Sequence, residues 1–194
     1  MHEDLSKIVG DAIVVSSAVS KPNLQSLESE SHQSQANQQF LRFQLGTSTA
    51  AMLPTSQLVE VIKIPIGKIV PLPHMPAWVT GVYNWRGEIL WMVDLGHLIG
   101  LAPWYIKTAN VSSHIAIAVD IASDSKGKGN QMLGLIVNRV DDIEWLNPDS
   151  IQSPPPSAVT PGLVPFLRGY WLSNRGEMLA VLDNRAIAAA MPQA

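Results

Sequence analysis

Residues 79–94 read VTGVYNWRGEILWMVD, and they carry the clearest structural signal in the chain. Residues 78–85 and 88–93 are two mainly apolar runs, and Arg86-Gly87 between them is a turn pair. Two such runs joined by a short turn that contains glycine predict a β-hairpin. Asp94 follows the second run, and aspartate is a preferred residue at the N-cap of a helix. The stretch therefore predicts a hairpin that leads into a short helix over 95–101.

The same pattern recurs near the C-terminus, where residues 175–183 read RGEMLAVLD with the same spacing from arginine to aspartate. A glycine lies on the incoming strand of each copy: Gly81 and Gly169. The second copy predicts a hairpin over 166–182, with Asp183 as the N-cap of a helix over 184–191. A duplicated unit of hairpin and helix indicates two similar small β subdomains packed together.

The rest of the sequence adds further short strands and loops. Alternating or short apolar runs predict strands at 41–45, 52–54, 58–62, 115–121 and 133–146. A turn is expected at 126–130, and the residues at 147–165, rich in proline and serine, predict a loop. Many short strands, frequent proline and glycine and almost no long helix indicate an all-β architecture of barrels or sandwiches.

The composition narrows the functional classes. The chain has 194 residues, of which 46% are apolar, with a formal net charge of −3 and no cysteine. A net charge near zero argues against nucleic acid as the main partner, and the lack of cysteine excludes disulfides, thiolate zinc sites and thiol nucleophiles. The longest apolar runs break well before the roughly 20 residues of a membrane span. The acidic start has no signal-peptide pattern, so we expect a cytoplasmic protein without direct membrane insertion.

The charge is unevenly distributed. Residues 1–37 hold five acidic and two basic residues, are rich in serine and glutamine and contain no aromatic residue, whereas the acidic and basic residues of 38–194 balance. A segment of this composition buries too little apolar surface to offset the entropy lost on ordering. We therefore predict a disordered N-terminal tail over 1–37 and a folded domain over 38–190.

The hairpin block, together with residues 58–62 (LVEVI), residues 70–73 (VPLP) and Val93-Asp94-Leu95, resembles the sequence pattern of CheW-like coupling proteins. The second hairpin resembles the C-terminal block of that family, so the resemblance covers about 38–190. It implies a fold of two small five-stranded β-barrels around a shared apolar core. The sequence departs from the family pattern at Trp85, where leucine is usual, and at Trp91, where a small residue or proline is common.

The resemblance also implies a function. Proteins of this family are adaptors without catalytic activity that connect the regulatory domain of a chemosensory histidine kinase to the cytoplasmic tip of methyl-accepting receptors. The signal controls chemotaxis or, in several bacteria, twitching motility or phototaxis, and the adaptor is recruited to receptor arrays at the membrane. The partner contacts it implies are Glu60, Gly81, Asn84, Arg86 and Gly87. Trp85 joins them if its side chain faces outward.

Single residues in this block have alternative interpretations. Arg86 is either a partner anchor or a structural residue, solvated at its turn or paired with Asp94 or Glu60. Glu60 lies between two valines, so we expect it to point outward from its strand. Several of the six tryptophans are expected in the cores of the barrels, and Trp85 is equally compatible with core and interface.

Other functions have less support in the sequence. The histidines are dispersed, so no metal site is expected, and no cofactor motif or catalytic constellation stands out. One alternative is a stand-alone regulator of the same family that competes with the main coupling protein. Another is a small β-barrel binding protein of unrelated function.

Overall fold

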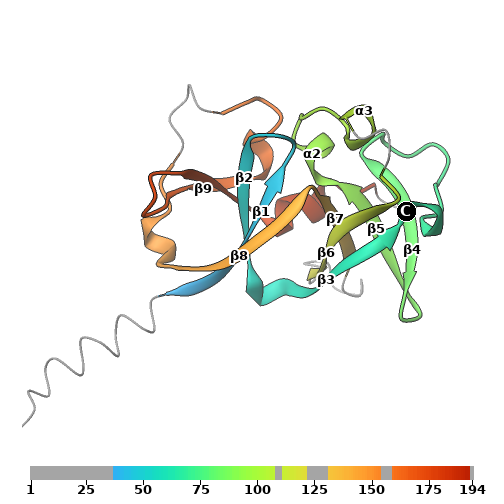
Figure 1. Cartoon of the computed structure of the whole chain (residues 1–194), viewed down its shortest axis with the longest axis horizontal. Helices are drawn as coiled ribbons and strands as arrows, with labels where there is room; N and C mark the ends of the chain where they lie inside the picture. The colour runs from blue at the N-terminus through green and yellow to red at the C-terminus, as the bar shows by residue number, and fades with distance from the viewer. Residues whose placement is uncertain (1–36, 108–110, 122–130, 154–158, 193–194) are drawn as a thin grey trace, which may run out of the picture. The chain divides into compact units, whose positions relative to one another are not determined.

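The computed structural model describes residues 37–107, 111–121, 131–153 and 159–192. The predicted tail, apart from residue 37, and the predicted turn at 126–130 lie outside these residues. The regular structure of the described residues consists of two five-stranded sheets with a few short helices, as the all-β prediction requires (Figure 1). No helix among the described residues has the length and hydropathy needed to cross a membrane.

The first sheet has the strand order β8-β1-β2-β10-β9. Its strands are β1 (Gln38–Leu45), β2 (Thr49–Pro54), β8 (Arg139–Leu146), β9 (Leu167–Leu172) and β10 (Met178–Leu182). The second sheet has the order β3-β6-β7-β5-β4. Its strands are β3 (Leu58–Pro65), β4 (Val79–Trp85), β5 (Glu88–Asp94), β6 (Ser113–Ile121) and β7 (Gln131–Val137).

The two sheets share one topology in a permuted chain order. Each has a single parallel pair, β2 with β10 in the first sheet and β5 with β7 in the second, flanked by antiparallel pairs. The consecutive strands β3 to β7 thus correspond to β8, β9, β10, β1 and β2. The two hairpins of the sequence repeat, β4–β5 and β9–β10, occupy equivalent places in this scheme, which confirms two similar subdomains.

Each sheet curls until the chain after one edge strand reaches the other edge. Val70, beyond the end of β3, pairs with Val82 of β4. Gln152, beyond the end of β8, pairs with Tyr170 of β9. These equivalent bridges bring the edge strands of each sheet together and give it the form of a small barrel.

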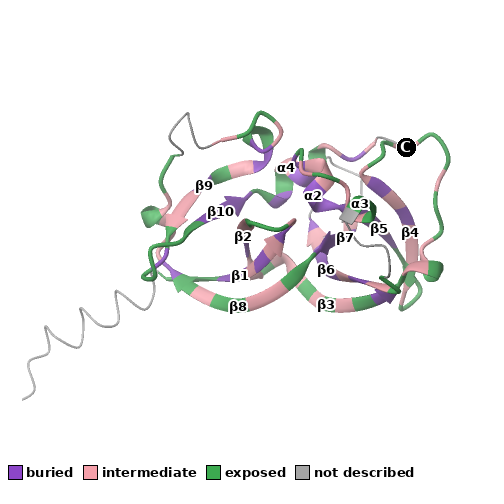
Figure 2. Cartoon of the chain, turned by 45° about the horizontal axis from the view of Figure 1, so that its top comes forward, coloured by how far each residue is buried: buried purple, intermediate pink, exposed green. Residues whose placement is uncertain are grey.

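Apolar side chains form three clusters. Alternation of buried with less buried residues along the strands explains why the clusters are separate, and Figure 2 shows how burial changes along each strand. Along β5, Leu90 and Met92 point into the second barrel, whereas Val93 faces the first barrel. Along β10, Leu179 and Val181 fill the first barrel. The largest cluster takes buried residues from both sheets, so the expected shared core lies between the barrels.

Short helices follow the hairpins as the sequence predicts. They are α2 (Leu95–Leu98) and α4 (Asn184–Ala189), and the helix α3 (Trp104–Lys107) was not foreseen. Asp94 caps α2 by accepting a hydrogen bond from the backbone N–H of His97, and Asp183 caps α4. The helix α2 is shorter than predicted because Gly100 adopts a left-handed φ of 87° just beyond it, a common way for a helix to end. The described residues also form short 3-10 helices: η1 (Thr55–Gln57), η2 (Ile66–Lys68), η3 (Pro148–Ser150) and η5 (Val164–Phe166).

The tryptophans differ from expectation. None of the six is among the fully buried side chains, and Trp145 is mostly exposed. The interiors of these five-stranded barrels are filled by phenylalanine, leucine, isoleucine and methionine instead. Trp85 and Trp171 pack at the margins of the two barrel cores, whereas Trp78 and Trp91 pack at the margin of the cluster between the barrels.

Candidate functional site

Glu60 does not point outward as predicted. On β3 the more buried residues are those in register with the buried Ile64, namely Glu60 and Ile62, and the exposed ones include Val59 and Val61. β3 therefore departs from the usual pattern in which apolar side chains face the core and polar ones face solvent. The carboxylate of Glu60 points toward the barrel, and Val59 and Val61 point toward solvent. The prediction placed Glu60 on the outer face because it did not start the alternation of inward and outward residues from the buried Ile64.

The turn of the β4–β5 hairpin is held in a left-handed conformation. Arg86 has a φ of 54° and Gly87 a φ of 90°, so both central residues are positive, as in the two-residue turns that match the twist of hairpin strands. The side-chain oxygen of Asn84 accepts a hydrogen bond of 3.1 Å from the backbone N–H of Gly87. Asn84 and Gly87 therefore fix the backbone from which the Arg86 side chain projects.

The Arg86 side chain lies across the barrel toward β3. Its Nη2 is 2.9 Å from Oε2 of Glu60, and its guanidinium carbon is 4.7 Å from the centre of the Trp85 ring. The first contact is an ion pair between the guanidinium and the carboxylate. The Arg86 side chain is nevertheless 68% exposed. Of the structural alternatives for Arg86, the structure shows the pair with Glu60.

Asp94, the other possible partner of Arg86, is occupied elsewhere. Its two carboxylate oxygens accept hydrogen bonds of 3.1 Å from the backbone N–H groups of His97 and Trp104. Asp94 thus fastens α2 and α3 to the end of β5, which is a structural role.

Gly81 is buried and lies apart from the exposed turn. A Cβ atom at this position would lie 2.2 Å from the carbonyl oxygen of Val70, and the φ of Gly81 is 141°. The missing side chain lets the Val70 segment approach β4 and form the bridge to Val82. The other predicted contact residues, Glu60, Asn84, Trp85, Arg86 and Gly87, come from the hairpin turn and from the strand that Arg86 reaches.

Exposed apolar residues accompany the turn on the same strands. Val59 and Val61 are exposed on β3, and Ile89 is exposed on β5 next to the turn. We name Trp85 and Arg86 the turn surface. Val59 and Val61 lie on the opposite face of β3 from Glu60, and Ile89, which pairs with Asn84, points to the opposite side of the hairpin from Trp85. None of the three aliphatic residues belongs to the predicted contact residues, although the strand alternation set by Ile64 indicates that the two valines are exposed.

The chemistry of the turn surface suits contact with another protein. A guanidinium can form forked hydrogen bonds with a carboxylate, and indole surface is favourable to bury. Within the described ranges no group of three histidine, aspartate or glutamate residues could hold a metal ion.

Comparison with known proteins identifies similar chains. The family described as CheW-like domain matches residues 39–191. The chemotaxis protein CheW of Rhizobium meliloti (strain 1021) is 32% identical over 114 residues, which cover 58% of this chain and 64% of that protein. The chemotaxis protein CheW of Treponema pallidum (strain Nichols) is 26% identical over 119 residues, covering 60% of this chain and 63% of that protein. The matched part thus spans less than two thirds of either relative.

A solved structure is also similar. It is the crystal structure of the scaffolding protein TtCheW from Thermoanaerobacter tengcongensis, with a TM-score of 0.60 and 26% sequence identity. The match covers 75% of this chain and 88% of that one. The two-sheet architecture described above is therefore shared with a known scaffold.

Proposed function

Because this chain belongs to the family of CheW-like domains, we propose that it is a non-enzymatic adaptor that couples methyl-accepting chemoreceptors to a chemosensory histidine kinase. Its partners are the regulatory domain of the kinase and the cytoplasmic tip of the receptors. Its place is the cytoplasm, at receptor arrays on the membrane. The family match over 39–191 and the similarity to a known scaffold support this proposal.

The turn surface is the observation that carries the proposal. Arg86 is exposed yet held in one position by the turn backbone, by Glu60 and by the Trp85 ring. Arginine and tryptophan are enriched at the energetic centre of protein interfaces. A positioned arginine loses little side-chain entropy when a carboxylate of a partner replaces Glu60.

Reconstitution from purified components tests the proposal. The full chain is mixed with a kinase regulatory domain and a receptor tip fragment, and complexes are separated by size and weighed by light scattering. A ternary complex is the expected result. Weak signalling contacts are still detected at concentrations of about tens of micromolar. Failure to bind either partner at such concentrations would exclude coupling.

The variant Arg86→Glu tests the turn surface itself. It should weaken receptor coupling about tenfold or more, because it places a carboxylate where a guanidinium is needed. Affinity is measured by calorimetry, and circular dichroism should report an intact fold, because the lost ion pair is exposed. The matched control is Arg175→Glu, which alters the corresponding turn of the other hairpin. Collapse of the dichroism signal in Arg86→Glu would instead show that Arg86 is structural.

The same components separate the coupling role from that of a competing regulator. A coupler joins kinase and receptor into one complex, whereas a regulator displaces another coupling protein and forms no ternary complex. Purification from the native cell with identification of the bound kinase and receptor assigns the output: chemotaxis, twitching motility or phototaxis.

A further inference from the structure

The chain passes from one barrel to the other at two places. Among the described strands, β1 and β2 belong to the first sheet, β3 to β7 belong to the second, and β8 to β10 return to the first. The first linker is therefore η1, between β2 and β3, and the second linker is Asn138, between β7 and β8. In the permuted correspondence of the strands, β2 matches β7 and β3 matches β8, so the two linkers occupy equivalent places.

Asn138 ties the second linker to the first barrel. Its backbone N–H donates a hydrogen bond of 3.0 Å to the carbonyl oxygen of Gln44 on β1. Its side-chain Oδ1 accepts a hydrogen bond of 2.6 Å from the backbone N–H of Gly46, in the turn between β1 and β2. Asn138 thus holds the point at which the chain enters β8 against the turn of the β1–β2 hairpin.

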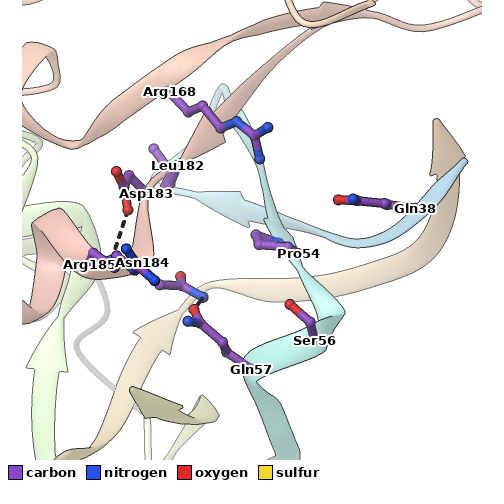
Figure 3. A pocket seen from close by; sticks show the side chains of 9 residues that line it. All are labelled: Gln38, Pro54, Ser56, Gln57, Arg168, Leu182, Asp183, Asn184 and Arg185. Carbon is purple, nitrogen blue, oxygen red and sulfur yellow. Dashed lines mark hydrogen bonds between the residues drawn. The ribbon is translucent and has the colours of Figure 1, made fainter. Parts of the chain in front are cut away.

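A second asparagine ties the first linker to the same barrel. Nδ2 of Asn184, the first residue of α4, donates a hydrogen bond of 2.8 Å to Oε1 of Gln57, the last residue of η1. Figure 3 shows these two side chains pointing toward one another, one from the start of α4 and the other from η1. Oγ1 of Thr55 donates a hydrogen bond of 3.3 Å to the carbonyl oxygen of Gln39 on β1. The first barrel therefore holds both ends of η1.

Asn184 is an unfavourable residue at its position if stability alone is considered. It is only 3% exposed, and its Oδ1 is buried without a hydrogen-bond partner among the described residues. A buried polar atom without a partner costs free energy, and an apolar side chain of similar size avoids that cost. The best-attested role of such buried polar residues is to select one arrangement of apolar surfaces among several.

The apolar cluster between the barrels does not select their orientation as sharply as hydrogen bonds do. The cluster takes buried residues from both sheets, and the hydrophobic effect that stabilises it has no preferred direction. Apolar cores lose a unique arrangement before they lose stability. A hydrogen bond, in contrast, weakens steeply when its angle changes. The bonds at the two linkers are therefore the contacts best suited to fix the angle between the barrels.

From these observations we infer that the two linkers define a hinge axis between the barrels, and that Asn138 and the pair of Asn184 with Gln57 lock this hinge at one angle. The apolar cluster supplies the free energy that holds the barrels together, and the two locks select their orientation. Asn138 and Asn184 are thus positioning residues for the barrels. The inference goes beyond the proposed coupling function and does not rest on it, because its test uses this chain alone.

The distance between two spin labels, one in each barrel of the full chain, reports the angle of the hinge. The chain has no cysteine, so Lys68→Cys in η2 and Arg175→Cys in the β9–β10 turn, both at exposed positions, provide one labelling site each. Pulsed electron paramagnetic resonance should show one narrow distance distribution. Adding Asn138→Ala and Asn184→Leu together should widen this distribution about twofold, because several orientations then have similar free energies. An unchanged distribution overturns the inference.

The matched control is Asn147→Ala in the same labelled chain. The side chain of Asn147 accepts a hydrogen bond of 2.9 Å from the backbone N–H of Asp149, within η3 and away from both linkers. This variant also removes an asparagine hydrogen bond, but it should leave the distance distribution unchanged. Equal widening in Asn147→Ala would show that the effect is not specific to the linkers and would overturn the inference.

Urea denaturation separates the selection of an orientation from a contribution to stability. Asn184→Leu should unfold at the same or a higher urea concentration than the native protein, because leucine removes the unpartnered buried oxygen. A lower midpoint would assign Asn184 to stability and contradict its role as a lock. Asn138→Ala removes only an exposed bond, so this single variant keeps the fold and tests the hinge by the same distance measurement.

Discussion

Arg86 combines an unfavourable backbone with two favourable side-chain contacts. A residue other than glycine in the left-handed region costs about 1 kcal/mol or more. An exposed ion pair such as that with Glu60 contributes up to about 1 kcal/mol, and a cation–π contact with Trp85 contributes a similar amount. The cost of the left-handed backbone and the gain from the two side-chain contacts nearly cancel. Arg86 can therefore exchange Glu60 for a partner with little effect on the stability of the turn.

Gly81 is the residue at which a single methyl group should cost most. In Gly81→Ala the new Cβ meets the backbone of Val70, which cannot move without breaking the bridge to Val82. We expect the free energy of unfolding to fall by roughly 2–4 kcal/mol, measured by urea denaturation. The control is Gly67→Ala, where no atom lies within 4 Å and φ is not left-handed. Equal stability of both variants would show that the close approach is not required.

His114 makes stability depend on pH. Burial lowers the pKa of His114 below its ordinary value of 6.5, and the charge of Asp94 opposes this only in part. The unfolded chain therefore binds the proton more readily, so stability falls as the pH drops through about 6.5 toward the lower folded pKa. In His114→Phe, which keeps an aromatic ring against Trp104, this part of the pH dependence should disappear from urea titrations at pH 5–8. An unchanged pH profile would assign the dependence to another group.

At the scale of elements, Arg42 connects three parts of the first barrel. It lies on β1 at an irregularity in the pairing with β8, and its side chain is 11% exposed. Nη1 of Arg42 is 2.7 Å from Oε2 of Glu177 in the β9–β10 turn, and Nε lies 3.5 Å from Asp141 of β8. The hydrogen bond with Glu177 raises the pKa of Arg42 above its usual value. In each barrel, an ion pair thus connects the turn of the repeated hairpin to another strand. The pairs are Arg86 with Glu60 in the second barrel and Glu177 with Arg42 in the first.

Removal of this central cation should loosen the first barrel. Arg42→Met removes the cation shared by Asp141 and Glu177, although Asp141 keeps its contacts with Arg139 and Gln44, and we expect a loss of roughly 1–3 kcal/mol in the free energy of unfolding. Arg42→Lys keeps the charge but not the forked geometry, so its loss should be smaller. Urea denaturation at low and high salt measures both. A variant Arg42→Met as stable as the native protein would contradict the importance of the cluster.

The elements that the sequence predicted correctly depend on neighbouring residues. Turn pairs, alternating runs and the capping aspartates Asp94 and Asp183 lie within a few positions of the structure they form. The direction of Glu60 follows from an alternation that starts at Ile64, which the prediction did not use. The pair of Arg42 with Glu177, by contrast, joins distant parts of the chain. Such contacts follow from register and closure, which a local pattern does not contain. The roles of Glu60, Gly81, Asn84, Trp85, Arg86 and Gly87 in partner binding stay predictions.

At the scale of the described domain, the cluster between the sheets makes both barrels one structural unit. Leu53 of β2 and Leu135 of β7 are both buried in this shared cluster. A barrel that depends on the other for part of its core is not expected to unfold alone.

Mutation of the shared cluster tests this cooperation. Leu53→Ala and Leu135→Ala should each lower the free energy of unfolding by about 2–5 kcal/mol, although they lie in different sheets. Tryptophan fluorescence and far-ultraviolet circular dichroism should report one coincident transition in each variant. Two separate transitions would show that the barrels unfold independently.

The permuted strand order also bears on how the chain is made. Strands β3 to β7 follow one another, so the second barrel has all its strands once residue 137 has left the ribosome. The hairpin of β1 and β2 is synthesised first, yet its neighbours β8 and β10 come last, with Ala51 beside Ala180. Until β8 and β10 are made, the outer edges of this hairpin have none of their native neighbours. The sheet edges of the first hairpin are therefore completed only by the strands that are made late.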